Sequence, residues 1–195
     1  MKAQILTSND FKTSAWSGGT TTQLYIYPPY AEYQLRNFDF RLSSARVETE
    51  KSEFTTLPGV ARKLMILDGE IVIHHQNHYS KKLGKFDVES FEGEWKTTSV
   101  GTCTDFNLMT TGATYGEISS LILAANQQST VQMTTINKWL FVFLLSGEIR
   151  IDSNHKSWML KQGNLISIQN DCNSTINVTG LKHSELVLVS IQLKG

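Results

Sequence analysis

Residues 67–73 read LDGEIVI, and residues 145–151 read LSGEIRI. Each copy follows an apolar stretch, LMI at residues 64–66 and VFL at residues 142–144. Asp-Gly between apolar residues is typical of a two-residue β-hairpin turn, because glycine tolerates the positive φ that such a turn needs. A repeated pattern of strand, Gly-Glu turn and strand predicts two similar β units.

Strand patterns continue along most of the chain. Residues 23–27 are aromatic and β-branched, and residues 38–47 and 105–109 alternate between apolar and polar side chains. Residues 185–193 form another apolar stretch near the C-terminus. These patterns predict an all-β protein.

Composition and charge exclude several classes of protein. Of the 195 residues, 40% are hydrophobic and 18% are charged, which excludes an intrinsically disordered chain. Lys plus Arg and Asp plus Glu both total 18, so the basic excess of a dedicated nucleic-acid binder or a polybasic membrane tether is missing. The apolar run at residues 139–145 is too short to span a bilayer, and residues 1–8 lack the apolar core of a signal peptide. We therefore expect a cytoplasmic protein.

The repeated segment resembles the core of the cupins, in which a strand ending in Leu-x-Gly-Glu turns back into a second strand. Two copies resemble a bicupin, which is a pair of small jelly-roll β-barrels packed together. The resemblance implies an N-terminal barrel at residues 1–115 and a C-terminal barrel at residues 116–195, as one bicupin whose halves can exchange strands.

Four segments resemble, in order, motifs of the HutD/Ves family of bicupins. They read WSGGTTTQL at 16–24, FDFRLSSA at 38–45, FTTLPGVAR at 54–62 and DFNLM at 105–109. The resemblance implies binding of a small acid such as formylglutamate in the regulation of histidine utilization, or a link to stress responses. No reaction is established for the family as a whole. The opening motif departs from the family pattern Trp-x-Asn-Gly-Gly-Gly-x-Thr, because it lacks the Asn.

Cupin metal sites normally contain a His-x-His pair, a Glu and a later His. The corresponding positions, residues 60–62 and 137–139, contain no histidine. His74, His75 and His78 follow the Gly-Glu turn instead, and adjacent strand residues point to opposite faces. We therefore expect no metal and no other cofactor.

Arg41 and Arg62 are the strongest candidates for a binding site. Each stands among apolar strand residues, where a charge is costly to bury unless it is paired. A guanidinium group suits the two oxygens of a carboxylate. The alternative is an internal ion pair, such as Arg62 with Asp105 or Arg41 with Glu70.

Other candidates belong to the same motifs. Asp105 and Asn107 point the same way from one strand, with Met109 beyond them, and Ser43 shares the strand face of Arg41. Trp16 could form an aromatic wall beside a Gly-Gly loop whose amides meet an anion. The predicted ligand-binding residues are Trp16, Gly19, Arg41, Ser43, Arg62, Asp105, Asn107 and Met109, and no catalytic residue is predicted.

Three functions are compatible with these features. The first is a metal-free cupin that binds a small carboxylate ligand as a regulator or metabolite sensor. The second is a metal-independent cupin enzyme, an isomerase, hydrolase or lyase, that acts on a small carboxylate. The third is a homodimeric interaction module. None of them involves nucleic acid or a membrane, and a homodimer is compatible with each.

Overall fold

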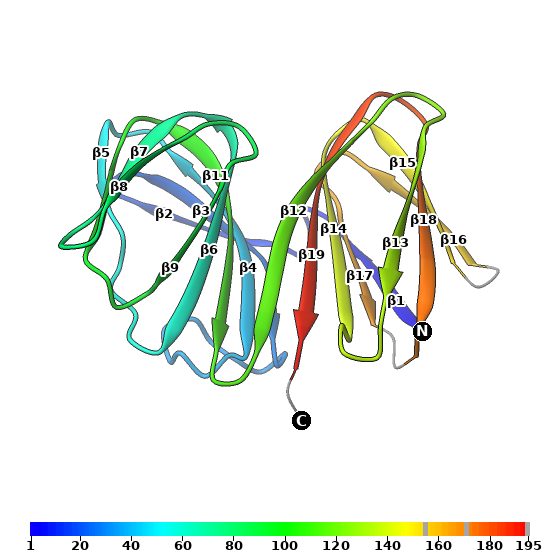
Figure 1. The fold of residues 1–195 in the computed structure, drawn as a ribbon, viewed down its shortest axis with the longest axis horizontal. Helices are drawn as coiled ribbons and strands as arrows, with labels where there is room; N and C mark the ends of the chain where they lie inside the picture. Colours follow the sequence, from blue (N-terminus) through cyan, green and yellow to red (C-terminus); the bar gives the residue numbers. More distant parts are fainter. Residues whose placement is uncertain (154–155, 170–171, 194–195) are drawn as a thin grey trace. The chain divides into compact units, whose positions relative to one another are not determined.

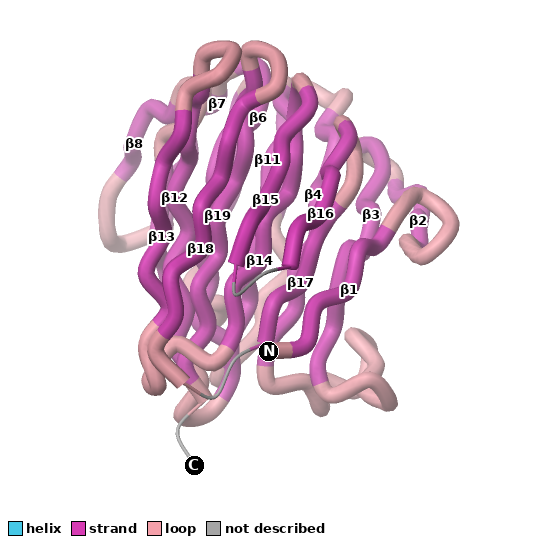
Figure 2. The backbone as a smooth tube through the Cα atoms, turned by 90° about the vertical axis from the view of Figure 1, so that its right-hand side faces the viewer, coloured by secondary structure: helices cyan, strands magenta, loops and turns pink. Residues whose placement is uncertain are grey.

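The computed structural model describes residues 1–153, 156–169 and 172–193, and these consist of strands joined by turns and loops (Figure 1, Figure 2). The all-β prediction is confirmed. No helix in the described part of the chain is long and apolar enough to cross a membrane.

The chain forms two compact units, and we call residues 11–114 the N-terminal unit. A six-stranded antiparallel sheet of this unit has the order β2-β3-β4-β11-β6-β9, and a four-stranded sheet has the order β5-β10-β7-β8. The strands of the larger sheet are β2 (Lys12–Trp16), β3 (Gly19–Tyr27), β4 (Phe40–Val47), β11 (Cys103–Thr111), β6 (Val60–Gly69) and β9 (Val88–Glu92). Those of the smaller sheet are β5 (Lys51–Glu53), β10 (Thr97–Val100), β7 (Ile71–His75) and β8 (Ser80–Leu83).

The C-terminal unit contains residues 115–195 together with residues 1–10. Its sheets have the orders β1-β17-β14-β19-β12 and β13-β18-β15-β16. The first ten residues, which the sequence assigned to the N-terminal barrel, join this unit because β1 pairs with β17. The strands are β1 (Lys2–Leu6), β17 (Leu165–Gln169), β14 (Trp139–Ser146), β19 (Ser184–Gln192), β12 (Tyr115–Leu123), β13 (Gln128–Met133), β18 (Ser174–Gly180), β15 (Glu148–Ser153) and β16 (Lys156–Lys161).

The repeated Gly-Glu segments are corners between sheets, so the prediction of two-residue hairpins is wrong. β6 pairs with β11 and β9, whereas β7 pairs with β10 and β8 in the other sheet. β14 and β15 are divided between sheets in the same way. Gly69 has a φ of 78° and Gly147 a φ of 91°, and these backbone conformations let the chain bend from one sheet into the other.

The repeat extends to a shared irregularity in strand pairing. In the N-terminal unit the register between β6 and β11 shifts beside Asp105, and in the C-terminal unit the register between β14 and β19 shifts beside Leu144. A bulge bends and twists its strand, and here it comes just before the chain turns the corner. Two units with the same sheet corner and the same bulge are a duplicated β architecture.

Candidate functional site

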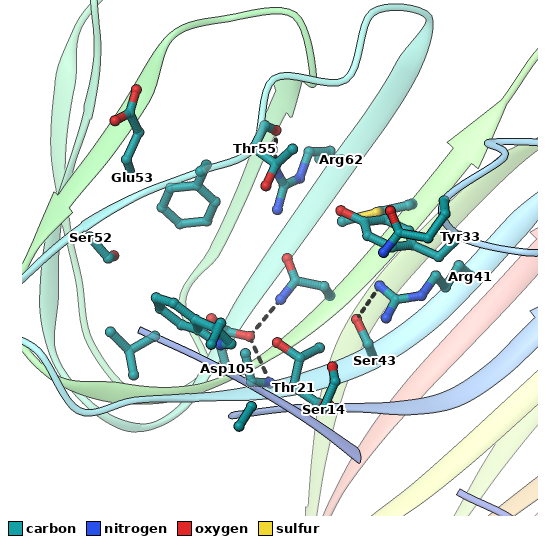
Figure 3. Close-up of a pocket in the computed structure, with 18 residues that line it drawn as sticks. Ser14, Thr21, Tyr33, Arg41, Ser43, Ser52, Glu53, Thr55, Arg62 and Asp105 are labelled. Atoms are coloured by element: carbon teal, nitrogen blue, oxygen red, sulfur yellow. Dashed lines mark hydrogen bonds between the residues drawn. The ribbon is translucent and has the colours of Figure 1, made fainter. Parts of the chain in front are cut away.

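A cavity of about 430 Å³ lies in the N-terminal unit and gathers most of the predicted site residues. Figure 3 shows Arg41, Arg62 and Asp105 directed into the same space from three strands. The predicted residues that line it are Trp16, Arg41, Ser43, Arg62, Asp105, Asn107 and Met109. Their role in binding a ligand stays a prediction.

Strand register explains how residues distant in sequence meet in this cavity. Met109 of β11 stands opposite Arg41 of β4 on one side and opposite Arg62 of β6 on the other. The two arginines lie on the strands to either side of β11, so their Cα atoms are roughly 10 Å apart. Along β11, Asn107 and Asp105 follow on the same face, because side chains alternate along a strand.

Arg41 is held in place by polar and aromatic neighbours. Its Nε donates to Gln23 Oε1 at 2.8 Å, and its Nη1 donates to Ser43 Oγ at 3.0 Å. The ring of Tyr33 covers the guanidinium group, with Cζ 4.4 Å from the ring centroid. Burial lowers the pKa of Arg41, and no described carboxylate lies within ion-pair distance to offset the cost.

Arg62 has even fewer polar partners. Its one hydrogen bond to a described residue is a long one, from Nη1 to Thr55 O at 3.4 Å, and its buried Nε has no partner there. The rings of Phe54 and Phe91 lie 5.0 and 5.1 Å from its Cζ. Burial lowers the pKa of Arg62 to about 10, so the group is still charged at neutral pH.

Asp105 and Asn107 form a buried pair on β11. Asp105 Oδ1 accepts from the Ala45 N–H at 3.2 Å and from Asn107 Nδ2 at 2.5 Å. Burial raises the pKa of Asp105 to about 7, against the opposing effects of the Ala45 N–H and of the charge on Arg62. A group with this pKa can exchange a proton near neutral pH.

The internal ion pairs that the sequence left open are not formed among the described residues. Asp105 lies near enough to Arg62 to influence its pKa, but the two do not reach ion-pair distance of 4 Å. Glu70 pairs instead with Lys82 at 3.0 Å on the surface. The two buried arginines therefore lack a carboxylate partner within the part of the chain that is described.

The glycine-rich opening motif contributes one wall of the cavity. Trp16 lines the cavity, and its ring covers Gly18, where a Cβ would lie 2.0 Å from a ring carbon. Gly19 is not among the lining residues. It has a φ of 146°, and a Cβ there would lie 1.9 Å from Arg46 O, so close backbone packing against β4 accounts for this glycine.

Sequence reasoning missed several lining residues, above all Tyr33. Tyr33 belongs to the loop between β3 and β4, and Phe54 follows β5. Neither lies in an alternating strand pattern, so no local signal connects these rings to the arginines. Arginine often lies over aromatic rings in folded proteins, but only the fold brings the members of such a pair together.

The C-terminal unit has an apolar interior where the N-terminal unit has the cavity. Leu140 precedes Gly147 by the same number of residues as Arg62 precedes Gly69, so Leu140 occupies the equivalent position. The pairing of β14 with β19 matches that of β6 with β11. The positions equivalent to Arg62, Asn107 and Asp105 are all leucines in or against one core cluster, namely Leu140, Leu188 and Leu186. The polar site is thus a property of one copy of the repeat.

The residues of the cavity do not fit a transition metal. Within the described ranges, no three His, Cys, Asp or Glu side chains lie close enough to hold a metal ion. His74 is exposed and His75 is buried, as expected from the alternation of a strand. His75 Nδ1 lies 2.8 Å from Thr97 Oγ1, and its Nε2 lies 3.8 Å from Glu89 Oε1, away from the arginines' cavity.

Solved structures share this architecture over the whole chain at low sequence identity. The protein PA5104 from Pseudomonas aeruginosa PAO1 has a TM-score of 0.85 at 18% identity, over 99% of this chain and 100% of that one. HutD from Pseudomonas fluorescens SBW25 has a TM-score of 0.77 at 18% identity, over 100% of both chains. The bacterial pirin YhhW from Escherichia coli, in complex with nickel(II), has a TM-score of 0.73 at 8% identity, over 99% of this chain and 100% of that one.

These likenesses confirm the bicupin fold, and the sequence itself supplies the family. No protein with a curated description matches the chain. The family model of HutD, however, matches residues 8–187, which includes all four motifs and both copies of the repeat. The chain therefore belongs to the HutD family.

Proposed function

We propose that this protein is a metal-free regulator or metabolite sensor that binds a small organic acid in the cavity of its N-terminal unit. One observation carries the proposal: Arg41 and Arg62 are each 6% exposed, line one cavity and lack a carboxylate partner among the described residues. Burying a charge without a partner is costly. A ligand carboxylate would supply the missing partner and offset that cost.

The size and lining of the cavity suit such a ligand. Its volume of about 430 Å³ is within the range of small-molecule sites. Aromatic rings over both guanidinium groups limit their contact with water and strengthen their interaction with an anion. A formylglutamate-like acid of the kind associated with histidine utilization has the right charge and size for this site.

Thermal shift and calorimetry with a panel of acids would test this function. Formate, acetate, succinate, glutarate and N-formylglutamate vary the length and the number of carboxylates. A bound acid should raise the melting temperature by mass action. Arg41→Gln should weaken binding by about 10- to 100-fold, because a charged hydrogen bond contributes about 1.5–3 kcal/mol.

Arg46→Gln is a matched control from the same strand. Arg46 is exposed and pairs with Glu48 at 3.2 Å, so its loss should leave affinity unchanged. If no acid in the panel binds at millimolar concentration, or if Arg41→Gln and Arg62→Gln bind as the wild type does, the proposed function is wrong.

A second candidate function is a metal-independent enzyme, and Asp105 favours it. This carboxyl group lines the cavity and has a pKa of about 7, which suits a general acid or base at neutral pH. Incubation of any acid that binds, followed by NMR of the mixture, separates the two functions. Turnover that is lost in Asp105→Asn would identify an enzyme, and binding without turnover would identify a sensor.

A further inference from the structure

Asn107 lines the cavity and has a side-chain acceptor with no partner among the described residues. The residue is 5% exposed and lines the cavity, and its Oδ1 is buried with no hydrogen bond to any described residue. Such an orphaned acceptor costs free energy until a donor reaches it. A carboxylate ligand alone offers acceptors and cannot supply that donor.

The orientation of the Asn107 amide is determined by Asp105. Asp105 Oδ1 accepts from the Ala45 backbone N–H, and a carboxyl group accepts more readily through its carbonyl oxygen than through its hydroxyl oxygen. A proton on Asp105 is therefore favoured at Oδ2, and Oδ1 is an acceptor for Asn107 as well. Only the Nδ2 end of the amide can satisfy it, and the two atoms are 2.5 Å apart. Protonation of Asp105 at Oδ2 would not change this. Asn107 Oδ1 therefore remains directed away from Asp105 as an acceptor.

The cavity thus has a donor end and an acceptor site. The donor end is formed by Arg41 and Arg62, which both stand opposite Met109. The buried Arg62 Nε has no acceptor among the described residues. Asn107 is two residues from Met109 on β11, so it stands roughly 7 Å along the strand from the level of the two arginines. A short chain with a carboxylate at one end and a donor at the other spans this distance.

We propose that the site selects carboxylic acids that carry a second, hydrogen-bond-donating group, such as a primary amide, and that Asn107 is the residue that reads it. This inference rests on the proposed function. The carboxylate binds at Arg41 and Arg62, and an N–H or O–H group a few bonds away donates to Asn107 Oδ1. Acids with only acceptors at that point leave the amide oxygen unpaired.

The test compares two probes that differ in the donor. Glutaramate ends in a primary amide, and monomethyl glutarate ends in an ester of similar length with the same single charge. Calorimetry should show that glutaramate binds about 10-fold or more tightly, since the ester leaves a buried acceptor unsatisfied. Succinamate and monomethyl succinate repeat the comparison with a chain shorter by one methylene.

Asn107→Leu tests whether this residue causes the preference for the amide. Leucine is the chosen replacement because Leu188 occupies the equivalent position of the C-terminal unit. The variant should bind both probes with similar affinity while Arg41→Gln weakens both. If Asn107→Leu does not fold, as judged by circular dichroism, Asn107→Ala supports the same comparison.

The outcomes separate the donor requirement from the carboxylate site. Equal affinity of the wild-type protein for amide and ester, or a preference that survives in Asn107→Leu or Asn107→Ala, overturns the donor requirement and leaves the carboxylate site standing. If none of the four probes binds while glutarate or N-formylglutamate does, the donor requirement is wrong and the proposed function stands. If no acid of the panel binds either, both are wrong.

Discussion

Arg41 and Arg62 stand opposite the same residue, Met109, on the two strands that flank β11. Both guanidinium groups line one cavity, and the pKa of Arg62, which burial lowers most, is lowered further by the charge on Arg41. Two like charges in a buried space repel each other, and an anion between them offsets that repulsion.

Replacement of Arg62 by Met should stabilise the free protein and abolish the response to acids. The change removes a buried charge that has no ion-pair partner among the described residues and keeps most of the side-chain volume. Each 1 kcal/mol gained should raise the melting temperature by about 2–4 °C for a chain of this size. Differential scanning calorimetry without and with glutarate measures both effects. A lower melting temperature for Arg62→Met without ligand would show that the guanidinium group is already well satisfied.

Asp105→Asn should stabilise the protein more at high pH than at low pH. Burial raises the pKa of Asp105 in the folded state to about 7, against the ordinary 3.8 of an aspartate carboxyl group. Between these two pH values the folded state therefore holds a proton that the unfolded state has lost. Stability from this group is present below about pH 4 and is lost as pH rises to about 7, by up to about 4 kcal/mol. Asparagine does not titrate, so the difference in unfolding free energy between variant and wild type should increase from pH 4 to 7.

Urea denaturation at a series of pH values measures this difference. Asp10→Asn is the control, because Asp10 is exposed in a turn at the start of the chain. Parallel stability curves for Asp105→Asn and the wild type would contradict a raised pKa at Asp105.

Tyr33→Leu should weaken acid binding about 5- to 30-fold without unfolding the protein. The Tyr33 ring lies over the Arg41 guanidinium and shields it from water, and a buried cation–π contact contributes about 1–2 kcal/mol. Tyr30→Leu in the same loop is the control, because Tyr30 is 79% exposed and does not line the cavity. Titration of both variants with the tightest acid of the panel decides the point, and equal affinities would show that Tyr33 does not position Arg41.

Gly147→Ala should destabilise the protein more than Gly163→Ala does. Both glycines have a positive φ, 91° and 80°, so both alanines incur backbone strain of about 1–2 kcal/mol. At Gly147 the new Cβ would also lie 2.3 Å from His183 O, whereas at Gly163 no atom of the described residues lies within 4 Å. Denaturation midpoints give the comparison, and a similar loss in both variants would show that the corner tolerates a side chain.

Local periodicity accounts for what the sequence determined. Alternation over residues 38–47 placed Arg41 and Ser43 on one strand face, and alternation over residues 105–109 did the same for Asp105 and Asn107. Side chains of a strand alternate wherever the strand is placed, so this property requires no knowledge of the partner strand. The duplicated Gly-Glu segment likewise predicted two similar β units, because it is a local pattern that occurs twice.

The tertiary structure decided which strands became neighbours, and so it decided the site. Only the register of β4, β11 and β6 puts Arg41 and Arg62 on either side of Met109, and only the loop after β3 brings Tyr33 over Arg41. The turn at Gly69 leads into another sheet, because β7 finds its partners in β8 and β10. Strand pairing depends on contacts between residues distant in sequence, and a local pattern of apolar and polar residues does not specify them.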